Sequence, residues 1–108
     1  MYTKQIKKVS RKQAKKNQEI NRIKKDLDYV CAMCGKYGVG DAAHIIPKSM
    51  FPQYYTEKWN IVSMCRMCHN EYDESKEVRE SQARLFTSAL NNVKKEYKGR
   101  VMKYFNKL

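Results

Sequence analysis

Apolar residues are sparse at the start of the chain and become regular only towards its end. Over residues 3–27 a thin aliphatic stripe recurs at helical spacing, and lysine or arginine fills many of the other positions. The stripe consists of Ile6, Val9, Ile20, Ile23 and Leu27. It is interrupted by Gln13, Lys16 and Asn17, so the pattern predicts a basic helix whose first half is weak without a partner.

The middle of the chain alternates between turns and short extended segments. Residues 28–40 are rich in glycine and cysteine, and residues 41–46 form a short β-competent run. An aromatic loop over residues 47–59 separates this run from a second predicted strand at residues 60–64. Both segments are predicted to be short strands.

From Arg66 the apolar spacing becomes helical. Between Ser75 and Lys98 it defines one packed face, which predicts a single long helix with Gly99 as its stop. One or two further helical turns are expected after Gly99. The face is formed by Val78, Leu85, Phe86, Ala89, Leu90, Val93 and Tyr97. These elements together predict an α+β fold.

The charge is uneven along the 108 residues, which carry 23 Lys+Arg against 11 Asp+Glu, a formal charge of +12. Residues 1–25 contain ten basic residues and one acid, and residues 94–108 contain six basic residues and one acid. The centre is almost balanced. Basic ends favour a polyanionic partner, because each lysine or arginine that neutralises a phosphate releases counterions. A solvated charged helix face is the structural alternative.

Several classes of protein are disfavoured by the composition. No stretch approaches 18 consecutive apolar residues, which excludes a transmembrane helix. The N-terminal residues lack the apolar segment of a signal peptide, and the basic stretch lacks the aromatic and leucine face of an interfacial helix. We therefore expect a cytoplasmic protein without a membrane partner.

The four cysteines form two CxxC pairs, Cys31/Cys34 and Cys65/Cys68. A two-residue spacer lets both thiolates of a pair reach one ion, and two such pairs complete a tetrahedral zinc site. Without a secretory context, metal binding is favoured over disulfides. The sequence predicts a structural zinc knuckle, which would help so short a chain to fold.

Two histidines and an asparagine stand between and after these pairs. The order is CxxC, then His44-Ile-Ile-Pro, then Asn60-Ile-Val, then CxxC followed by His69. Over residues 29–75 this order resembles the zinc-bearing HNH endonucleases, many of which are encoded by phages. For a phage-encoded protein, the cytoplasm would be that of the host cell.

The resemblance implies a ββα-metal core with a four-cysteine zinc knuckle, flanked by helices at both ends. The implied organisation is a basic helical extension at residues 1–28, the zinc-bound core at residues 29–80 and a helical segment at residues 81–108. His44 would be the general base that activates water, Asn60 would orient it, and His69 would bind a catalytic cation such as Mg²⁺, Mn²⁺ or Ni²⁺. The substrate would be DNA.

The sequence departs from the family just before the proposed base. That position usually holds Asp or His, a second metal ligand, but here it is Ala43. Asp73 follows His69 by four residues, which places both on one helix face, and is the first substitute. Asp41 is the next, although its carboxylate would need the strand to turn. Phage recombination nucleases share a Gly/Ala-His motif at this point, so branched DNA is a substrate to test.

Basic residues supply the remaining candidate contacts to DNA. Near the proposed site these are Lys48, Lys58 and Arg66, and in the N-terminal helix they are Lys7, Lys8, Arg11, Lys12, Lys15 and Lys16. Two other functions stay open. One is a catalytically silent zinc domain that binds DNA or RNA through its basic ends. The other is an interaction module that uses the helix over residues 75–98 as a partner or dimer surface.

Overall fold

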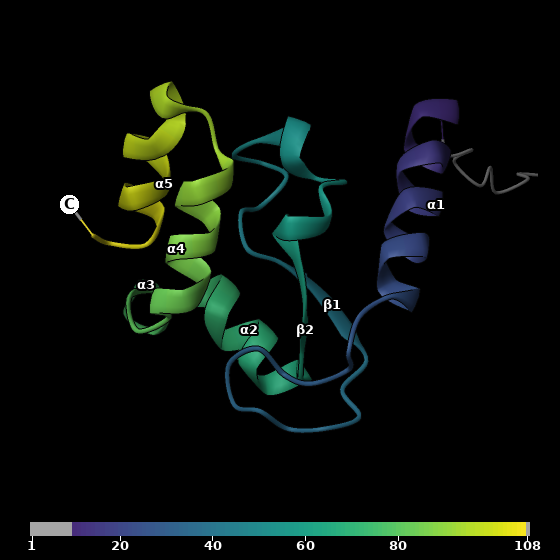
Figure 1. The fold of residues 1–108 in the computed structure, drawn as a ribbon, viewed down its shortest axis with the longest axis horizontal. Coiled ribbons are helices and arrows are strands. Elements are labelled where there is room, and N and C mark those ends of the chain that lie inside the picture. Colours follow the sequence, from purple (N-terminus) through teal and green to yellow (C-terminus); the bar gives the residue numbers. More distant parts are fainter. Residues whose placement is uncertain (1–9, 108) are drawn as a thin grey trace, which may run out of the picture.

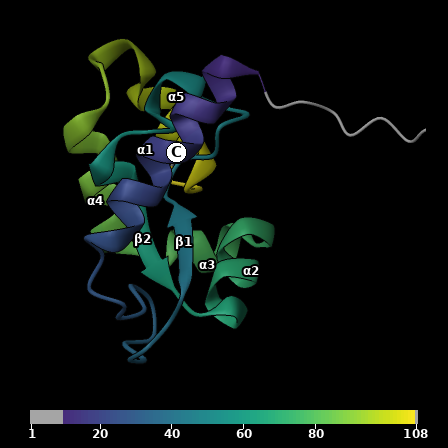
Figure 2. The same cartoon turned by 90° about the vertical axis from the view of Figure 1, so that its right-hand side faces the viewer.

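The computed structural model describes residues 10–107. Five α-helices and one antiparallel pair of strands within these residues confirm the α+β class. The elements are α1 (Arg11–Lys25), β1 (Asp41–His44), η1 (Pro52–Tyr54), η2 (Lys58–Asn60), β2 (Ile61–Met64), α2 (Arg66–Glu74), α3 (Lys76–Glu80), α4 (Ala83–Asn92), η3 (Lys95–Tyr97) and α5 (Lys98–Tyr104). The sheet lies between α1 on one side and the other helices on the opposite side (Figures 1 and 2). No helix among these residues has the length and apolar character needed to cross a membrane.

The two strands are short and fully paired, with His44 opposite Ile61. β1 ends two residues earlier than predicted, because Ile45 and Ile46 leave the ladder and become buried in the loop. Their backbone N–H groups donate to the backbone and side-chain oxygens of Asn60, at 2.9 and 2.8 Å. The start of the long loop after β1 is therefore anchored to the residue that precedes β2.

Helix α1 begins where Ser10 accepts a hydrogen bond from the backbone N–H of Gln13 at 3.1 Å. Ile23 is buried, and Gln13, Lys16 and Ile20 are half-buried at helical spacing from it. The polar residues that interrupt the aliphatic stripe therefore continue the inward face of the helix. The predicted turns before Ser10 lie outside the described residues.

The prediction of one helix over residues 75–98 is wrong. The chain there forms α3 and α4, and Gly99 lies inside α5 instead of ending a helix. At Val93 the backbone is extended and the chain turns back, so that α5 packs against α4. This reversal brings Val101 and Phe105 into the core, where both are fully buried. A single straight helix would leave them without apolar contacts.

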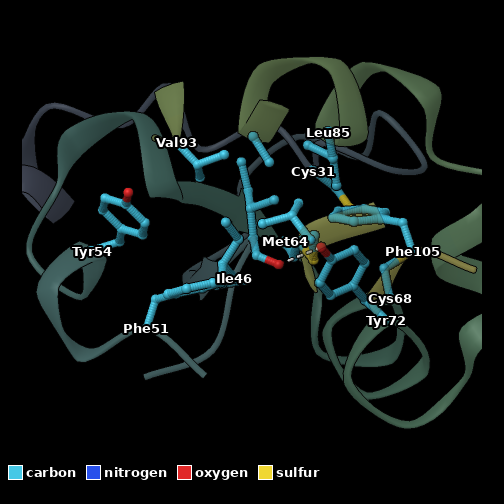
Figure 3. Packing of buried hydrophobic residues seen from close by; sticks show 14 of the residues in the cluster. Cys31, Ile46, Phe51, Tyr54, Met64, Cys68, Tyr72, Leu85, Val93 and Phe105 are labelled. Carbon is cyan, nitrogen blue, oxygen red and sulfur yellow. Dashed lines mark hydrogen bonds between the residues drawn. The ribbon is translucent and has the colours of Figure 1, made fainter. Parts of the chain in front are cut away.

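One cluster of buried apolar side chains runs through the molecule (Figure 3). Met64 of β2 lies near its middle, with Ile46 and Phe51 on one side and Tyr72 and Phe105 on the other. The rings of the last two meet nearly edge to face, 6.1 Å apart. The segments predicted as an HNH core and a C-terminal extension thus contribute to the same hydrophobic core.

Candidate functional site

The four cysteines converge at one end of the sheet. Their sulfur atoms all lie within 4.8 Å of one another, and the Sγ atoms of Cys34 and Cys65 are 3.9 Å apart. Tetrahedral zinc with Zn–S bonds of about 2.3 Å places its sulfur ligands roughly 3.8 Å apart, so this donor set fits the ion. The predicted four-cysteine metal site is confirmed as a cluster able to hold zinc.

Local backbone structure directs these sulfurs. The N–H groups of Cys34 and Cys68 point to the sulfurs of Cys31 and Cys65, at 3.5 and 3.4 Å. Gly35 follows the first pair at φ +78°, a conformation that glycine adopts without strain. Burial disfavours a thiolate at Cys31, but hydrogen bonds from neighbouring backbone N–H groups outweigh it and lower its pKa to about 6. Backbone donors around a sulfur stabilise the anionic form that binds metal.

His44 is held from one side by Tyr55. Its Nε2 lies 2.8 Å from the backbone oxygen of Tyr55, and the two rings stack with centroids 4.7 Å apart. A carbonyl oxygen only accepts, so Nε2 carries the proton and Nδ1 of the neutral ring carries the lone pair. Burial lowers the pKa of His44 below its ordinary value of 6.5, and the hydrogen bond to Tyr55 opposes this only in part. The ring is therefore neutral at pH 7.

His69 lies between two carboxylates. Its Nδ1 is 3.0 Å from Oδ2 of Asp41 in β1, and its Nε2 is 3.3 Å from Oδ2 of Asp73 one turn along α2. The hydrogen bond from His69 lowers the pKa of Asp41, and the charge of Arg66 at 3.2 Å adds to the effect. When Nδ1 donates to Asp41, the lone pair of Nε2 faces Asp73. These two atoms can serve as a pair of ligands for one cation.

A cleft of about 430 Å³ brings these groups together. It is called the histidine cleft below, and the lining residues used in the argument are His44, Lys48, Tyr55, His69, Asp73 and Tyr104. Asp41 is not part of the lining, since it lies behind His69. Ala43 is fully buried and also absent from the lining. A larger cavity of about 890 Å³ lies beside the cysteine loops and contains neither histidine.

Asn60 is completely buried and makes no hydrogen bond to His44. Its side-chain oxygen accepts from the N–H of Ile46, and its amide nitrogen donates to the oxygens of Ile46 and Tyr54, each at 3.0 Å. Tyr54 precedes the residue whose carbonyl binds His44. Asn60 therefore fixes both ends of the loop that carries Tyr55, and acts on His44 only through that loop.

The predicted basic residues lie in different surroundings. Lys48 is at the histidine cleft, with its ammonium 4.8 Å above the Tyr55 ring and 2.9 Å from the side-chain oxygen of Gln13. Arg66 is paired with Asp41. The other described candidates are exposed: Lys58 in η2, and Arg11, Lys12 and Lys15 in α1, with Lys16 half-buried. Lys7 and Lys8 lie outside the described residues.

Three residues of the site were not identified from the sequence. Tyr55 and Tyr104 line the histidine cleft. Arg79 is buried and donates to the carbonyl oxygens of Tyr72, Asp73 and Tyr104, at 2.6, 3.0 and 3.0 Å. Arg79 thereby donates hydrogen bonds to carbonyl oxygens in the last turn of α2, which have no N–H partner within the helix. A lone arginine in an amphipathic stretch carries no sequence signal for this role.

No protein-family model matches the chain, and neither a curated protein nor a solved structure is detectably similar to it.

Proposed function

We propose that this protein is a metal-dependent endonuclease of the HNH type that hydrolyses phosphodiester bonds of DNA. One observation carries the proposal. A single cleft contains a neutral imidazole with a free lone pair, His44, and a pair of potential cation ligands, His69 and Asp73. The elements that supply them, β1 and α2, follow the order of the ββα-metal core that the sequence resemblance implies.

His44 is the general base in this proposal. Nδ1 takes a proton from a water molecule, whose oxygen forms a bond to phosphorus while the bond to the 3′ oxygen breaks. The departing 3′ oxygen takes up a proton from solvent water, and the products are a 5′-phosphate and a 3′-hydroxyl. An imidazole that is neutral at pH 7 can accept this proton, and the hydrogen bond to Tyr55 keeps the basic nitrogen in place.

Nε2 of His69 and the carboxylate of Asp73 would hold the catalytic cation. A divalent cation such as Mg²⁺, Mn²⁺ or Ni²⁺ supplies positive charge that stabilises the phosphate and the departing 3′ oxygen. Asp41 would not be a ligand of this cation, because it faces Nδ1 of His69, on the opposite side of the ring from Nε2. It would instead orient the His69 ring and raise its basicity, as carboxylates behind metal-bound histidines do.

The two remaining groups support substrate binding and folding. Lys48 provides a cation at the rim of the cleft for a phosphate oxygen. The cysteine cluster, with zinc bound, would fix the start of α2, since Cys65 and Cys68 flank the first turn of that helix. His69 follows directly, so the proposed structural zinc would also set the position of the catalytic ligand.

A second candidate function is a zinc domain that binds nucleic acid without cutting it. The observation in its favour is Ala43, which is buried and offers no ligand beside His44. Of the described residues that line the histidine cleft, His69 and Asp73 are then the two proposed to hold a cation. The basic surface of α1 serves either function equally.

A cleavage assay separates the two candidates. Supercoiled plasmid and a branched DNA are incubated with added Mg²⁺, Mn²⁺ or Ni²⁺, or with EDTA, using wild type and His44→Ala of verified zinc content. Metal-dependent cutting that His44→Ala lacks would support the nuclease. Tight, salt-sensitive binding without cutting under any metal would instead identify a silent binding domain.

A further inference from the structure

A second, basic hollow adjoins the histidine cleft. It has a volume of about 380 Å³ and is called the basic recess below. Its lining residues are Met50, Lys76, Arg100, Lys103 and Tyr104. Tyr104 also lines the histidine cleft, so one side chain forms a wall of both hollows.

Three cations surround the recess and no carboxylate lines it. Lys103 lies one turn after Arg100 on α5, and Lys76 begins α3. None of the three forms an ion pair with a described residue. The nearest acid in sequence, Glu77, accepts a hydrogen bond from Ser75. Three like charges in one hollow repel one another, and an anion bound among them relieves that repulsion.

Arg100 is already fixed in position. Its guanidinium lies 4.5 Å from the centre of the Phe51 ring, and one of its nitrogens donates to the backbone oxygen of Met50 at 3.2 Å. The remaining N–H groups stay available to a ligand, since a guanidinium has five donors. An arginine held in this way loses little conformational freedom when it binds a phosphate.

The position of Tyr104 between the two hollows indicates which anion the basic recess binds. Successive phosphates of one nucleic-acid strand are close neighbours along its backbone, so a strand with one phosphate in the histidine cleft carries the next ones past Tyr104. The aromatic side chain of Tyr104 and the thioether of Met50 give the recess an apolar wall suited to a sugar. An unrelated acidic ligand would not require the recess to adjoin the histidine cleft.

We infer that the basic recess binds a backbone phosphate of the same DNA strand whose neighbouring phosphate occupies the histidine cleft. The inference rests on the proposed function for the substrate in that cleft. Lys76, Arg100 and Lys103 are the phosphate contacts, and Tyr104 separates the two subsites. The recess would fix which phosphate enters the cleft.

The test compares two double variants that remove equal charge. Lys76→Ala/Lys103→Ala removes from the recess two exposed lysines whose side chains make no hydrogen bond in the described structure. Lys94→Ala/Lys95→Ala removes two exposed lysines at η3, outside the recess. Arg100 is left in place because it packs on Phe51. Binding of a short labelled duplex and of a labelled single strand is measured by anisotropy over a range of salt, without added divalent cation.

Loss of both recess lysines is expected to weaken binding about tenfold and to flatten the slope of log affinity against log salt by about 0.9 per lost contact. The η3 variant should change neither by a comparable amount. Equal effects of the two variants, or no effect of the recess variant, would overturn the inference. Cleavage is assayed in parallel. If wild type cuts nothing but the recess variant alone loses affinity, the nuclease proposal fails while the recess still binds DNA.

Discussion

Nε2 of His44 lies 2.8 Å from the backbone oxygen of Tyr55, and the planes of the two rings are only 8° apart. The carbonyl fixes the tautomer of the imidazole, and the stacked ring shields one of its faces from water. Both effects come from the same residue, eleven positions along the chain. His44 therefore stays neutral with its lone pair on Nδ1, as a general base requires.

The stacking of Tyr55 on His44 can be tested through the acid side of the pH–rate profile. Burial lowers the pKa of His44 below its ordinary value of 6.5, so the acid-side fall of the wild-type kcat/KM, where His44 becomes protonated, should lie at lower pH than for an exposed imidazole. Tyr55→Ala admits water, raises the pKa towards its ordinary value and moves this limb to higher pH. Tyr55→Phe keeps the ring and should leave the limb in place. Coincident limbs for Tyr55→Ala and wild type would contradict the role of the stack, and NMR titration of the imidazole gives an independent reading.

The two aspartates beside His69 should differ in their effect on metal binding. Asp73→Ala removes a proposed ligand and should raise the Mn²⁺ concentration needed for cutting more than about a hundredfold. Asp41→Asn removes no proposed metal ligand but weakens the support of His69 and the ion pair with Arg66, and a loss of about 10–100-fold is expected. Mn²⁺ titrations of cleavage, with electron paramagnetic resonance of bound Mn²⁺, measure both. Glu71→Gln, an exposed acid on the same helix, is the control. A larger loss for Asp41→Asn than for Asp73→Ala would reverse the assignment.

Local spacing was sufficient to predict part of the site. Each CxxC pair closes within one turn, so its two sulfurs are neighbours before any tertiary structure forms. His69 and Asp73 are four residues apart on one helix, which determines their proximity once α2 exists. The two strands were predicted near their observed positions, although β1 ends two residues before and β2 begins one residue after the predicted bounds.

Contacts between distant elements could not be predicted in the same way. The hydrogen bond between Asp41 and His69 depends on how α2 packs against β1, and sequence spacing alone suggested that Asp41 was too far up the strand. The predicted helix breaks at Val93 without a local signal in the sequence. The cause is tertiary packing, since α5 folds back at this point and buries Phe105. Nothing in the chain near Arg79 indicates that it caps α2.

Zinc should be required for folding. A structural zinc bound by the cysteine loops contributes on the order of 10 kcal/mol to the free energy of folding. Cys68→Ser leaves a buried position without its thiolate and should abolish stoichiometric zinc and the cooperative thermal transition. His69→Ala should keep both, because His69 contacts Asp41 and Asp73 and not the cysteines. Elemental analysis and circular dichroism measure the two properties. A cooperative, zinc-free fold of Cys68→Ser would contradict a structural role.

Asn60 should matter for stability more than its size suggests. Asn60→Ala breaks three buried hydrogen bonds and leaves groups of Ile46 and Tyr54 without partners, for an expected loss of roughly 2–4 kcal/mol in the free energy of unfolding. Urea denaturation of the zinc-loaded protein measures it. Asn91→Ala, at an exposed position of α4, should stay within about 0.5 kcal/mol of wild type. Equal midpoints for the two variants would show that Asn60 does not hold the loop.

The exposed face of α1 should contribute affinity for DNA without contributing to the chemistry. Arg11, Lys12 and Lys15 point away from the body of the molecule, whereas Ile23 on the inward face is buried, so substitution of the three is cleaner than deletion of the helix. Replacing all three by glutamine should flatten the salt dependence of DNA binding by up to about 0.9 per residue.

A charge-conserving control, Arg11→Lys/Lys12→Arg/Lys15→Arg, keeps the electrostatic contribution and should retain the wild-type slope. At saturating DNA the glutamine variant should cut as fast as wild type, since none of the three residues lines the histidine cleft. An unchanged salt slope in the glutamine variant would assign the charge of α1 to solvation alone. DNA affinity would then have to come from other basic residues, among them those of the basic recess and Lys48, which lie at or beside the histidine cleft.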